Sequence, residues 1–145
     1  MTKRMILLST NHPHLRFPGK EIFRALKLVY KNEGRDIPAL AVICTHNRFI
    51  RRINKNFLAH DTVTDVIAFP PDEDGEGEAE IYINLDAARN QAKEYNDTYT
   101  QEARRLLIHA VLHMLGYNDK TQRGKSKMNA REEFYLALIS RKARV

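Results

Sequence analysis

Two histidines spaced four residues apart are the clearest chemical feature of the sequence. They lie in HAVLHMLGYND (residues 109–119), where His109 and His113 precede Gly116 and Asp119. On a helix, residues i and i+4 project from one face, one turn apart. Both imidazoles can therefore reach one ion at the roughly 2.0–2.1 Å of a zinc–nitrogen bond. Because Gly116 can adopt a positive φ and turn the chain back, we expect Asp119 to supply a third ligand and to leave a fourth position open for water.

Other interpretations of this motif stay open. Histidine pairs at this spacing also occur on ordinary helices, and Asn118 and Asp119 could simply cap a turn. Zincin-type proteases place a glutamate general base directly after the first histidine, and here that residue is Ala110. The motif therefore disfavours a protease. Apolar Leu112 and Met114 flank the second histidine and predict that the pair lies in or near the core.

Composition predicts one globular domain over residues 1–145. The chain is 43% hydrophobic and 29% charged, and Cys44, its one cysteine, lies in an apolar run that predicts a buried thiol. A single cysteine excludes an internal disulfide, and no segment approaches the roughly 18 apolar residues of a membrane helix. These features predict a cytoplasmic protein without a membrane partner. The net charge of +6 favours polyanionic partners.

Hydrophobic periodicity predicts the elements that must position the motif. Alternating or continuous apolar runs predict strands, and apolar residues at three- and four-residue spacing predict helices. The segment 70–80, rich in acidic residues, proline and glycine, predicts a surface loop. The order βαβαββααα predicts an α/β (α+β) single domain, with a small mixed sheet of about four strands packed by about five helices. The predicted strands are 5–10, 38–45, 64–69 and 80–85, and the helices are 19–33, 47–57 capped by Asn47, 86–96 capped by Asp86, 100–115 capped by Thr100, and 126–141.

The pattern H-x-x-x-H-x-x-G-Y resembles the YbeY family of bacterial rRNA-maturation endoribonucleases. INKNF (53–57), TDVIAFP (64–70), EIYIN (80–84) and QAKEYN (91–96) follow the family's order and spacing, and Glu132 or Glu133 fits a carboxylate near its C-terminus. The similarity covers about residues 38–136. It implies a compact fold with a zincin-like helix, one zinc ion, and hydrolysis of single-stranded RNA. It further implies 16S rRNA 3′-end maturation and ribosome quality control, with rRNA and the small ribosomal subunit as partners rather than DNA.

Three departures from the family pattern bear on the chemistry. The family motif usually ends in Gly-Tyr-Asp-His, whereas here Asn118 and Asp119 stand at the last two positions. A carboxylate ligand lowers the charge of the zinc unit from +2 to +1, which should activate water less and favour harder ions such as manganese. Leu58 replaces an arginine thought to contact RNA phosphate, which places strong nuclease activity in question, and Ala110 replaces a glycine.

Basic residues near the motif are the candidates for RNA contacts, although a solvated helix face explains them equally well. Thr64 and Asp65 either orient the site or cap a strand end, and His12, His14 and His46 show no ligand spacing and are given no role. No general base is identifiable, so the catalytic residues stay unassigned and a zinc-activated water is the expected nucleophile. The alternative functions are a non-catalytic ribosome-biogenesis factor stabilised by zinc, or a metal-dependent hydrolase of another substrate. The RNA-binding candidates are Arg51, Arg52, Lys55, His60, Arg123 and Lys125.

Overall fold

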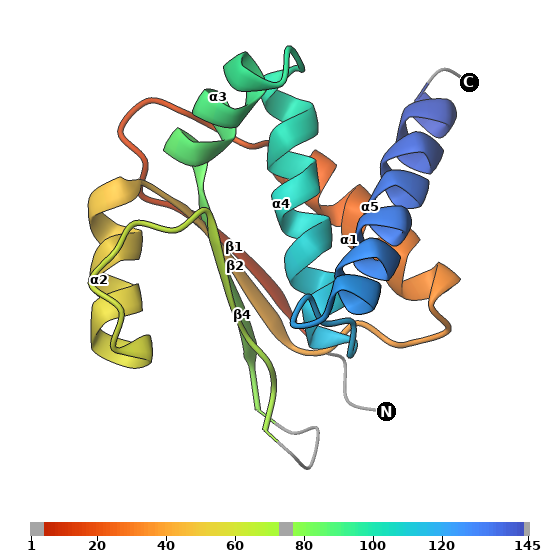
Figure 1. Ribbon diagram of the computed structural model, residues 1–145, viewed down its shortest axis with the longest axis horizontal. Helices are drawn as coiled ribbons and strands as arrows, with labels where there is room; N and C mark the ends of the chain where they lie inside the picture. The colour runs from red at the N-terminus through yellow and green to blue at the C-terminus, as the bar shows by residue number, and fades with distance from the viewer. Residues whose placement is uncertain (1–4, 73–76, 144–145) are drawn as a thin grey trace.

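The computed structural model describes residues 5–72 and 77–143, which form one domain with the predicted βαβαββααα order (Figure 1). Part of the predicted surface loop, residues 73–76, lies outside the described residues, and Ala79 and Glu80 at its end belong to a strand. In the described part of the chain, no helix is long and apolar enough to cross a membrane. The elements are β1 (Ile6–Thr10), α1 (Gly19–Asn32), β2 (Leu40–Thr45), α2 (Asn47–Leu58), β3 (Val66–Phe69), β4 (Ala79–Asn84), α3 (Leu85–Glu94), α4 (Tyr99–Met114) and α5 (Gln122–Ala143).

The four strands form one mixed sheet in the order β1-β2-β4-β3. Strands β1, β2 and β4 run parallel, and β3 pairs antiparallel with β4. The register places Leu40 beside Ala79 and Cys44 beside Ile83. The carboxyl ends of the three parallel strands therefore lie at one edge of the sheet, and the predicted mixed sheet is confirmed.

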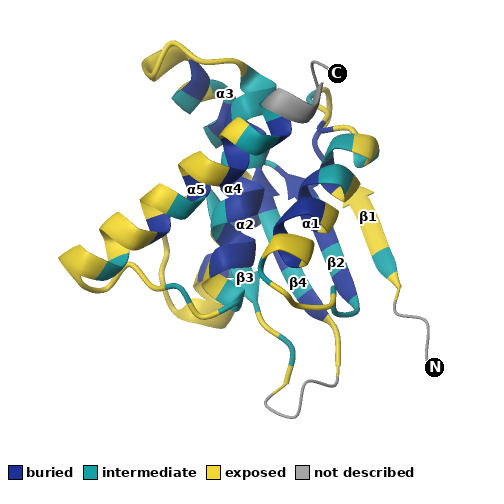
Figure 2. Cartoon of the chain, turned by 90° about the vertical axis from the view of Figure 1, so that its right-hand side faces the viewer, coloured by how far each residue is buried: buried dark blue, intermediate teal, exposed yellow. Residues whose placement is uncertain are grey.

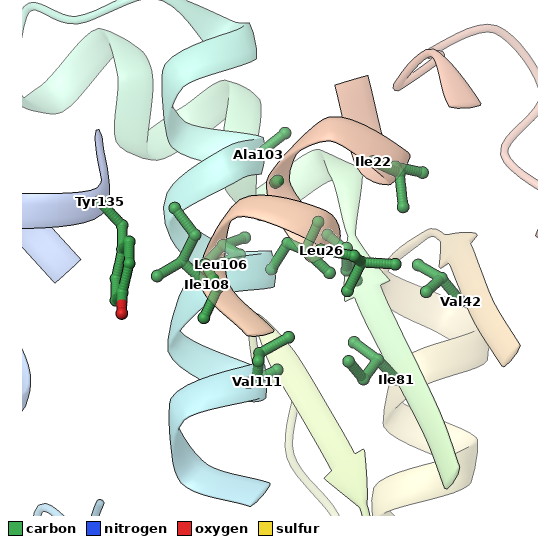
Figure 3. Close-up of a cluster of buried hydrophobic side chains, with 14 of the residues drawn as sticks. Ile22, Leu26, Val42, Ile81, Ala103, Leu106, Ile108, Val111 and Tyr135 are labelled. Atoms are coloured by element: carbon green, nitrogen blue, oxygen red, sulfur yellow. The ribbon is translucent and has the colours of Figure 1, made fainter. Parts of the chain in front are cut away.

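Helices cover the two faces of the sheet unequally. Helices α1, α4 and α5 lie on one face, and α2 packs alone on the other (Figure 1). The core lies between these helices and the sheet, where Leu26 of α1 lies beside Val42 and Ile81 of the strands and Ile108 of α4 belongs to the same cluster (Figure 3). Cys44 is buried in this layer as predicted, whereas the edge strand β1 is largely exposed (Figure 2).

Helix α4 is the central helix of this layer, and its two faces differ in chemistry. Leu107, Ala110 and Val111 are buried against the sheet and the neighbouring helices. His109 and His113 lie on the other side, where His109 is half-buried and His113 is exposed. The prediction that the histidine pair lies in or near the core is therefore wrong for His113 and holds only in part for His109, because apolar side chains of the same helix occupy the core face.

The predicted helix caps are wrong by one or two residues. The side chain that accepts the first backbone N–H belongs to His46 in α2, Asn84 in α3 and Thr98 in α4, rather than to Asn47, Asp86 and Thr100. A cap residue needs an extended backbone, and His46, Asn84 and Thr98 have it.

Two further expectations from periodicity need correction. The last helix begins at Gln122 rather than Ser126, and the Thr121 hydroxyl accepts a hydrogen bond from the Gly124 N–H at 3.0 Å. The apolar spacing within 47–57 predicts that Phe57 shares a face with Ile50, but Phe57 is 68% exposed, because Ile50 and Asn54 fill the contact of α2 with the sheet.

Candidate metal centre and RNA site

The two histidines of α4 share one open cavity with the predicted third ligand. His109, His113 and Asp119 all line a cavity of about 410 Å³, here called the metal-site cavity. Asn54 and Leu58 form its wall on the side of α2. The structure thus brings the three predicted ligands to one cavity, and it places Leu58 in the wall of that same cavity.

Glu132 fixes the orientation of the His109 ring. Its carboxylate Oε1 lies 3.1 Å from His109 Nδ1, and Glu132 is only 5% exposed. The hydrogen bond to Glu132 raises the pKa of His109, burial opposes the rise, and the charges of Glu132, Asp65 and Asp119 add to it. A carboxylate on one ring nitrogen is the usual support of a metal-binding histidine, because it leaves the other nitrogen free for the ion.

The turn after α4 positions Asp119. Gly116 has a φ of 109°, as the predicted reversal of the chain requires. The Tyr117 hydroxyl donates to Glu33 Oε1 at 2.9 Å and so ties the turn to the end of α1. On the other side, α5 approaches so closely that a Cβ on Gly124 would lie 2.5 Å from the Asn118 carbonyl oxygen. The turn is therefore held from two sides.

The residues present fit a zinc ion by donor type. Two imidazoles and one carboxylate are ordinary zinc ligands, and the free nitrogen of His109 follows from its bond to Glu132. Among residues 5–72 and 77–143, however, no three histidine, cysteine or acidic side chains are gathered closely enough to hold an ion. The Asn118 side chain also accepts from the Lys120 N–H at 3.3 Å, so the expected turn cap exists at that residue. The three-ligand centre stays a prediction.

Asp65 joins the metal-site cavity to a second cavity. Its side chain lines both the metal-site cavity and a neighbouring cavity of about 570 Å³, and His109 is common to the two. Gln91 Nε2 donates to Asp65 Oδ2 at 3.2 Å. The carbonyls of Thr64 and Asp65 accept hydrogen bonds from the side chain and backbone of Asn84. Asp65 thus has its backbone fixed at the start of β3 and its carboxylate at the site.

The predicted RNA contacts are exposed but lie on separate elements. Four of them belong to α2 and the turn after it, where Arg51 pairs with Asp61 at 2.8 Å. Two lie in the first turn of α5, which follows the Asp119 turn directly. All six are accessible to a ligand: Arg51, Arg52, Lys55, His60, Arg123 and Lys125.

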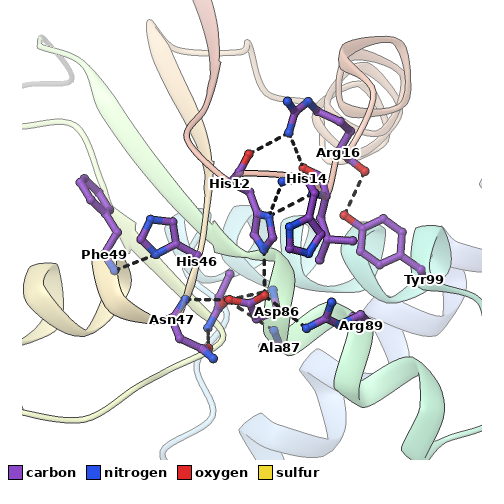
Figure 4. A network of polar contacts seen from close by, with 12 residues as sticks. His12, His14, Arg16, His46, Asn47, Phe49, Asp86, Ala87, Arg89 and Tyr99 are labelled. Carbon is purple, nitrogen blue, oxygen red and sulfur yellow. Dashed lines mark hydrogen bonds and ion pairs between the residues drawn. The ribbon is translucent and has the colours of Figure 1, made fainter.

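His12 and His46, which showed no ligand spacing, have structural roles: His46 caps α2, and His12 pairs with Asp86 (Figure 4). His12 is buried, its Nε2 donates to Asp86 Oδ1 at 2.8 Å, and its Nδ1 accepts from the N–H groups of His14 and Leu15. Burial alone would raise the pKa of Asp86, but the bonds from His12 and the Asn47 N–H lower it below its usual range. The pair ties the segment after β1 to the start of α3, and 74 residues separate its members in the sequence.

Comparisons with known proteins agree with this architecture. The family model described as "Endoribonuclease YbeY" matches residues 16–140. A protein of that name from Chlorobaculum tepidum is 40% identical over 77% of this chain and 81% of its own. Another, from Chlorobium chlorochromatii, is 36% identical over 93% of this chain and 86% of its own. The solution structure of TM1509 from Thermotoga maritima covers 97% of this chain and 92% of its own, with a TM-score of 0.66 and 27% identity.

Proposed function

The chain belongs to the YbeY family, and we propose on this premise that it is a zinc-dependent endoribonuclease that hydrolyses single-stranded RNA. One observation carries the proposal: His109, His113 and Asp119 line one open cavity, and Glu132 holds the His109 ring. A bound zinc ion would supply a Lewis acid that activates water and polarises a phosphate oxygen. Other divalent metals are alternatives for the same donors.

Each cavity residue has a distinct part in this proposal. The imidazoles of His109 and His113 and the carboxylate of Asp119 would hold the ion, and Glu132 orients the first of them. Asp65 is a hydrogen-bond acceptor in the wall of the same cavity, so it could align the attacking water. The cavity is open to solvent at His113 and Asp119, which leaves an RNA strand room to enter.

Charge supports RNA as the substrate class. The chain carries a formal charge of +6, and the exposed cations of α2 and of the first turn of α5 are the candidates for phosphate contacts. By its family, we further propose that the protein acts in the cytoplasm, on the 3′ end of 16S rRNA and in quality control of the small ribosomal subunit.

Cleavage of single-stranded RNA by purified protein tests the proposal. After metal removal and zinc addition, we expect the native chain to cleave and His113→Ala to lose about 100-fold or more of that activity. His14→Ala removes an exposed histidine that does not line the cavity and should cleave as the native chain does. Equal cleavage by the native chain and His113→Ala would reject the proposal.

A non-catalytic role in ribosome biogenesis is the second candidate. The observation in its favour is Leu58, which lines the metal-site cavity where the family has an arginine. In that role zinc would only join α4 to the turn after it. If neither native chain nor variant cleaves RNA but the native chain binds components of the small subunit, this role is favoured. Hydrolysis of another phosphodiester or of an amide would instead indicate a metal-dependent hydrolase of a different substrate.

A further inference from the structure

The second cavity adjoins the metal-site cavity, and its position suggests a purpose. It lies between α3, α4 and α5, has a volume of about 570 Å³, and is here called the α3–α5 cavity. This volume is in the range of roughly 300–1,000 Å³ typical of small-molecule sites. Because Asp65 and His109 line it together with the metal-site cavity, a nucleotide next to a phosphate at the metal site would reach it.

The charge of this cavity excludes two classes of ligand. Carboxylates outnumber cations in its wall, so the phosphates of an RNA backbone are repelled from it. A divalent cation is also disfavoured, because the Arg105 guanidinium lies among the acidic residues of the wall. The acidic residues of the wall are Asp65, Asp97, Glu102, Glu132 and Glu133, against the cation Arg105.

Arg105 creates an alternating row of hydrogen-bond acceptors and donors along the wall. Its Nε lies 3.4 Å from Glu102, and its Nη1 donates to Glu133. Glu102 is buried and therefore fixed, whereas the Glu133 side chain is 64% exposed and is free to accept from a ligand. Such a row matches the edge of a nucleobase that offers N–H donors beside carbonyl or ring-nitrogen acceptors.

The other wall residues suit an aromatic ligand. Tyr95, the residue that follows α3, lines the cavity and is 66% exposed, so its ring is accessible to a ligand. Leu106 supplies an apolar surface, and the Asn129 amide adds a donor and an acceptor. Proteins that read single-stranded RNA stack unpaired bases on aromatic rings and hydrogen-bond their edges.

We propose that the α3–α5 cavity binds an unpaired guanine of the RNA, next to the phosphate at the metal-site cavity. Guanine alone offers two adjacent donors, N1–H and the N2 amino group, to one carboxylate, and its O6 and N7 accept from Arg105. Uracil has a single N–H donor, so it forms the fewest hydrogen bonds with the donors and acceptors of the wall. The inference rests on the proposed function, since it makes this cavity the base-reading part of an RNA site.

Binding of short RNAs that differ in one base tests the inference. The probes are end-labelled pentamers UUGUU, UUAUU, UUCUU and UUUUU, whose equal backbone charge cancels the phosphate contacts. They are titrated with protein in the presence of a chelator, so that hydrolysis does not interfere, and anisotropy is measured. We expect UUGUU to bind about tenfold more tightly than UUUUU. Equal affinity for the four pentamers would overturn the inference.

Substitutions of residues in the cavity wall test whether a preference for guanine arises at this cavity. Glu133→Gln keeps the shape of an exposed side chain but removes the carboxylate, so the preference for UUGUU should fall to about twofold or less. Tyr95→Ala should weaken UUGUU binding about fivefold or more, whereas Tyr95→Phe keeps the ring and should not. A guanine preference that survives Glu133→Gln would place base reading elsewhere and contradict the inference.

The binding experiment and the cleavage experiment test different claims, so a negative result in one does not decide the other. A chain that prefers guanine in the chelated state but cleaves no RNA contradicts the proposed function alone. A chain that cleaves RNA in a zinc-dependent manner but binds the four pentamers equally contradicts the base site alone. Thermal melting of each variant checks that it is folded, so that a loss of RNA binding can be separated from a loss of stability.

Discussion

At the scale of single residues, two neighbouring glutamates of α5 have opposite surroundings. Glu132 is 5% exposed and bonds to His109, whereas the side chain of Glu133 points to solvent and pairs with Arg105. A step of one residue on a helix is a rotation of about 100°, so only one of the two can face the α4 histidine. Glu132 therefore supports the proposed metal ligand, and Glu133 is the accessible carboxylate in the wall of the α3–α5 cavity.

This difference predicts unequal effects on metal binding. We expect Glu132→Ala to weaken zinc binding about 10–100-fold, because His109 loses the carboxylate that orients it. Glu132→Gln, which retains an acceptor, should be intermediate, and Glu133→Ala should bind zinc as the native chain does. Competition with a chromogenic chelator measures the zinc affinity of the native chain and of the three variants. The same affinity in Glu132→Ala and Glu133→Ala would show that Glu132 does not support the ligand.

If Asp119 is a ligand, its carboxylate should influence whether the site prefers zinc or manganese. A carboxylate is a harder ligand than imidazole, so Asp119→His should raise the preference for zinc over manganese. The measurement is the ratio of zinc to manganese affinity in the native chain and the variant, independent of any activity. Lys120→His, one residue later and exposed, is the matched control. If Asp119→His leaves the ratio unchanged, Asp119 is not a ligand.

That His109, His113 and Asp119 line one cavity could be predicted because their spacing is local. The sequence could not decide whether Glu132 or Glu133 is the carboxylate near the site, since the direction of each side chain depends on how α5 packs against α4. His12 and Asp86 could not be paired at all, because 74 residues separate them. Long-range polar pairs follow from tertiary packing, which periodicity does not describe.

At the scale of the elements, the approach of α5 to the α4–α5 turn controls the site. A methyl group on Gly124 would meet the Asn118 carbonyl at 2.5 Å and the Asn118 Oδ1 at 2.9 Å. The turn that carries Asp119 can therefore keep its place only if this position has no side chain. The Tyr117 bond to Glu33 limits movement on the other side of the turn.

Gly124→Ala should accordingly displace the turn. We expect zinc affinity to fall about tenfold or more and stability to fall by about 1–3 kcal/mol, because the overlap involves backbone atoms that cannot move alone. Lys125→Ala, at the next and exposed position, should leave both unchanged. Zinc competition and urea unfolding provide the two measurements. Native zinc affinity in Gly124→Ala would show that the turn does not position a ligand.

The elements themselves were largely predictable, and their ends were not. Apolar spacing determines which segments are helices, and all nine elements follow the predicted order. The observed helix caps differ from the predicted ones because several neighbouring residues have side chains that can cap, and the cap is the one whose backbone is extended. Asp86, predicted as a cap, instead bonds to His12, Arg89 and the Asn47 N–H.

At the scale of the whole molecule, a partly buried polar network joins α1 to α5 and to the turn before α5. Glu33 at the end of α1 accepts hydrogen bonds from Arg131 and Tyr135 of α5 and from Tyr117 of the turn. Burial alone would raise the pKa of Glu33, but the bonds from Arg131, Tyr135 and Tyr117 outweigh it and lower the pKa. The carboxylate is thus more stable ionised in the folded chain than in the unfolded one.

The network predicts how stability depends on pH. Because the pKa of Glu33 is lowered on folding, its contribution is fully present above the unfolded value near 4.5 and is lost as pH falls through the folded value. Glu33→Gln should therefore lower the free energy of unfolding by about 1–3 kcal/mol at pH 7, and the deficit should shrink below pH 4.5. Urea unfolding at pH 3–7 measures it. A deficit that stays constant with pH would contradict the assignment.

The metal content of the purified protein tests the central claim most directly. Protein prepared without a chelating column is analysed for zinc and manganese beside a folded His113→Ala variant. With His109, His113 and Asp119 around one cavity, we expect about one ion per native chain and almost none in the variant. An equal metal content in the two proteins, whether one ion or none, would contradict the metal centre from which the proposed chemistry follows.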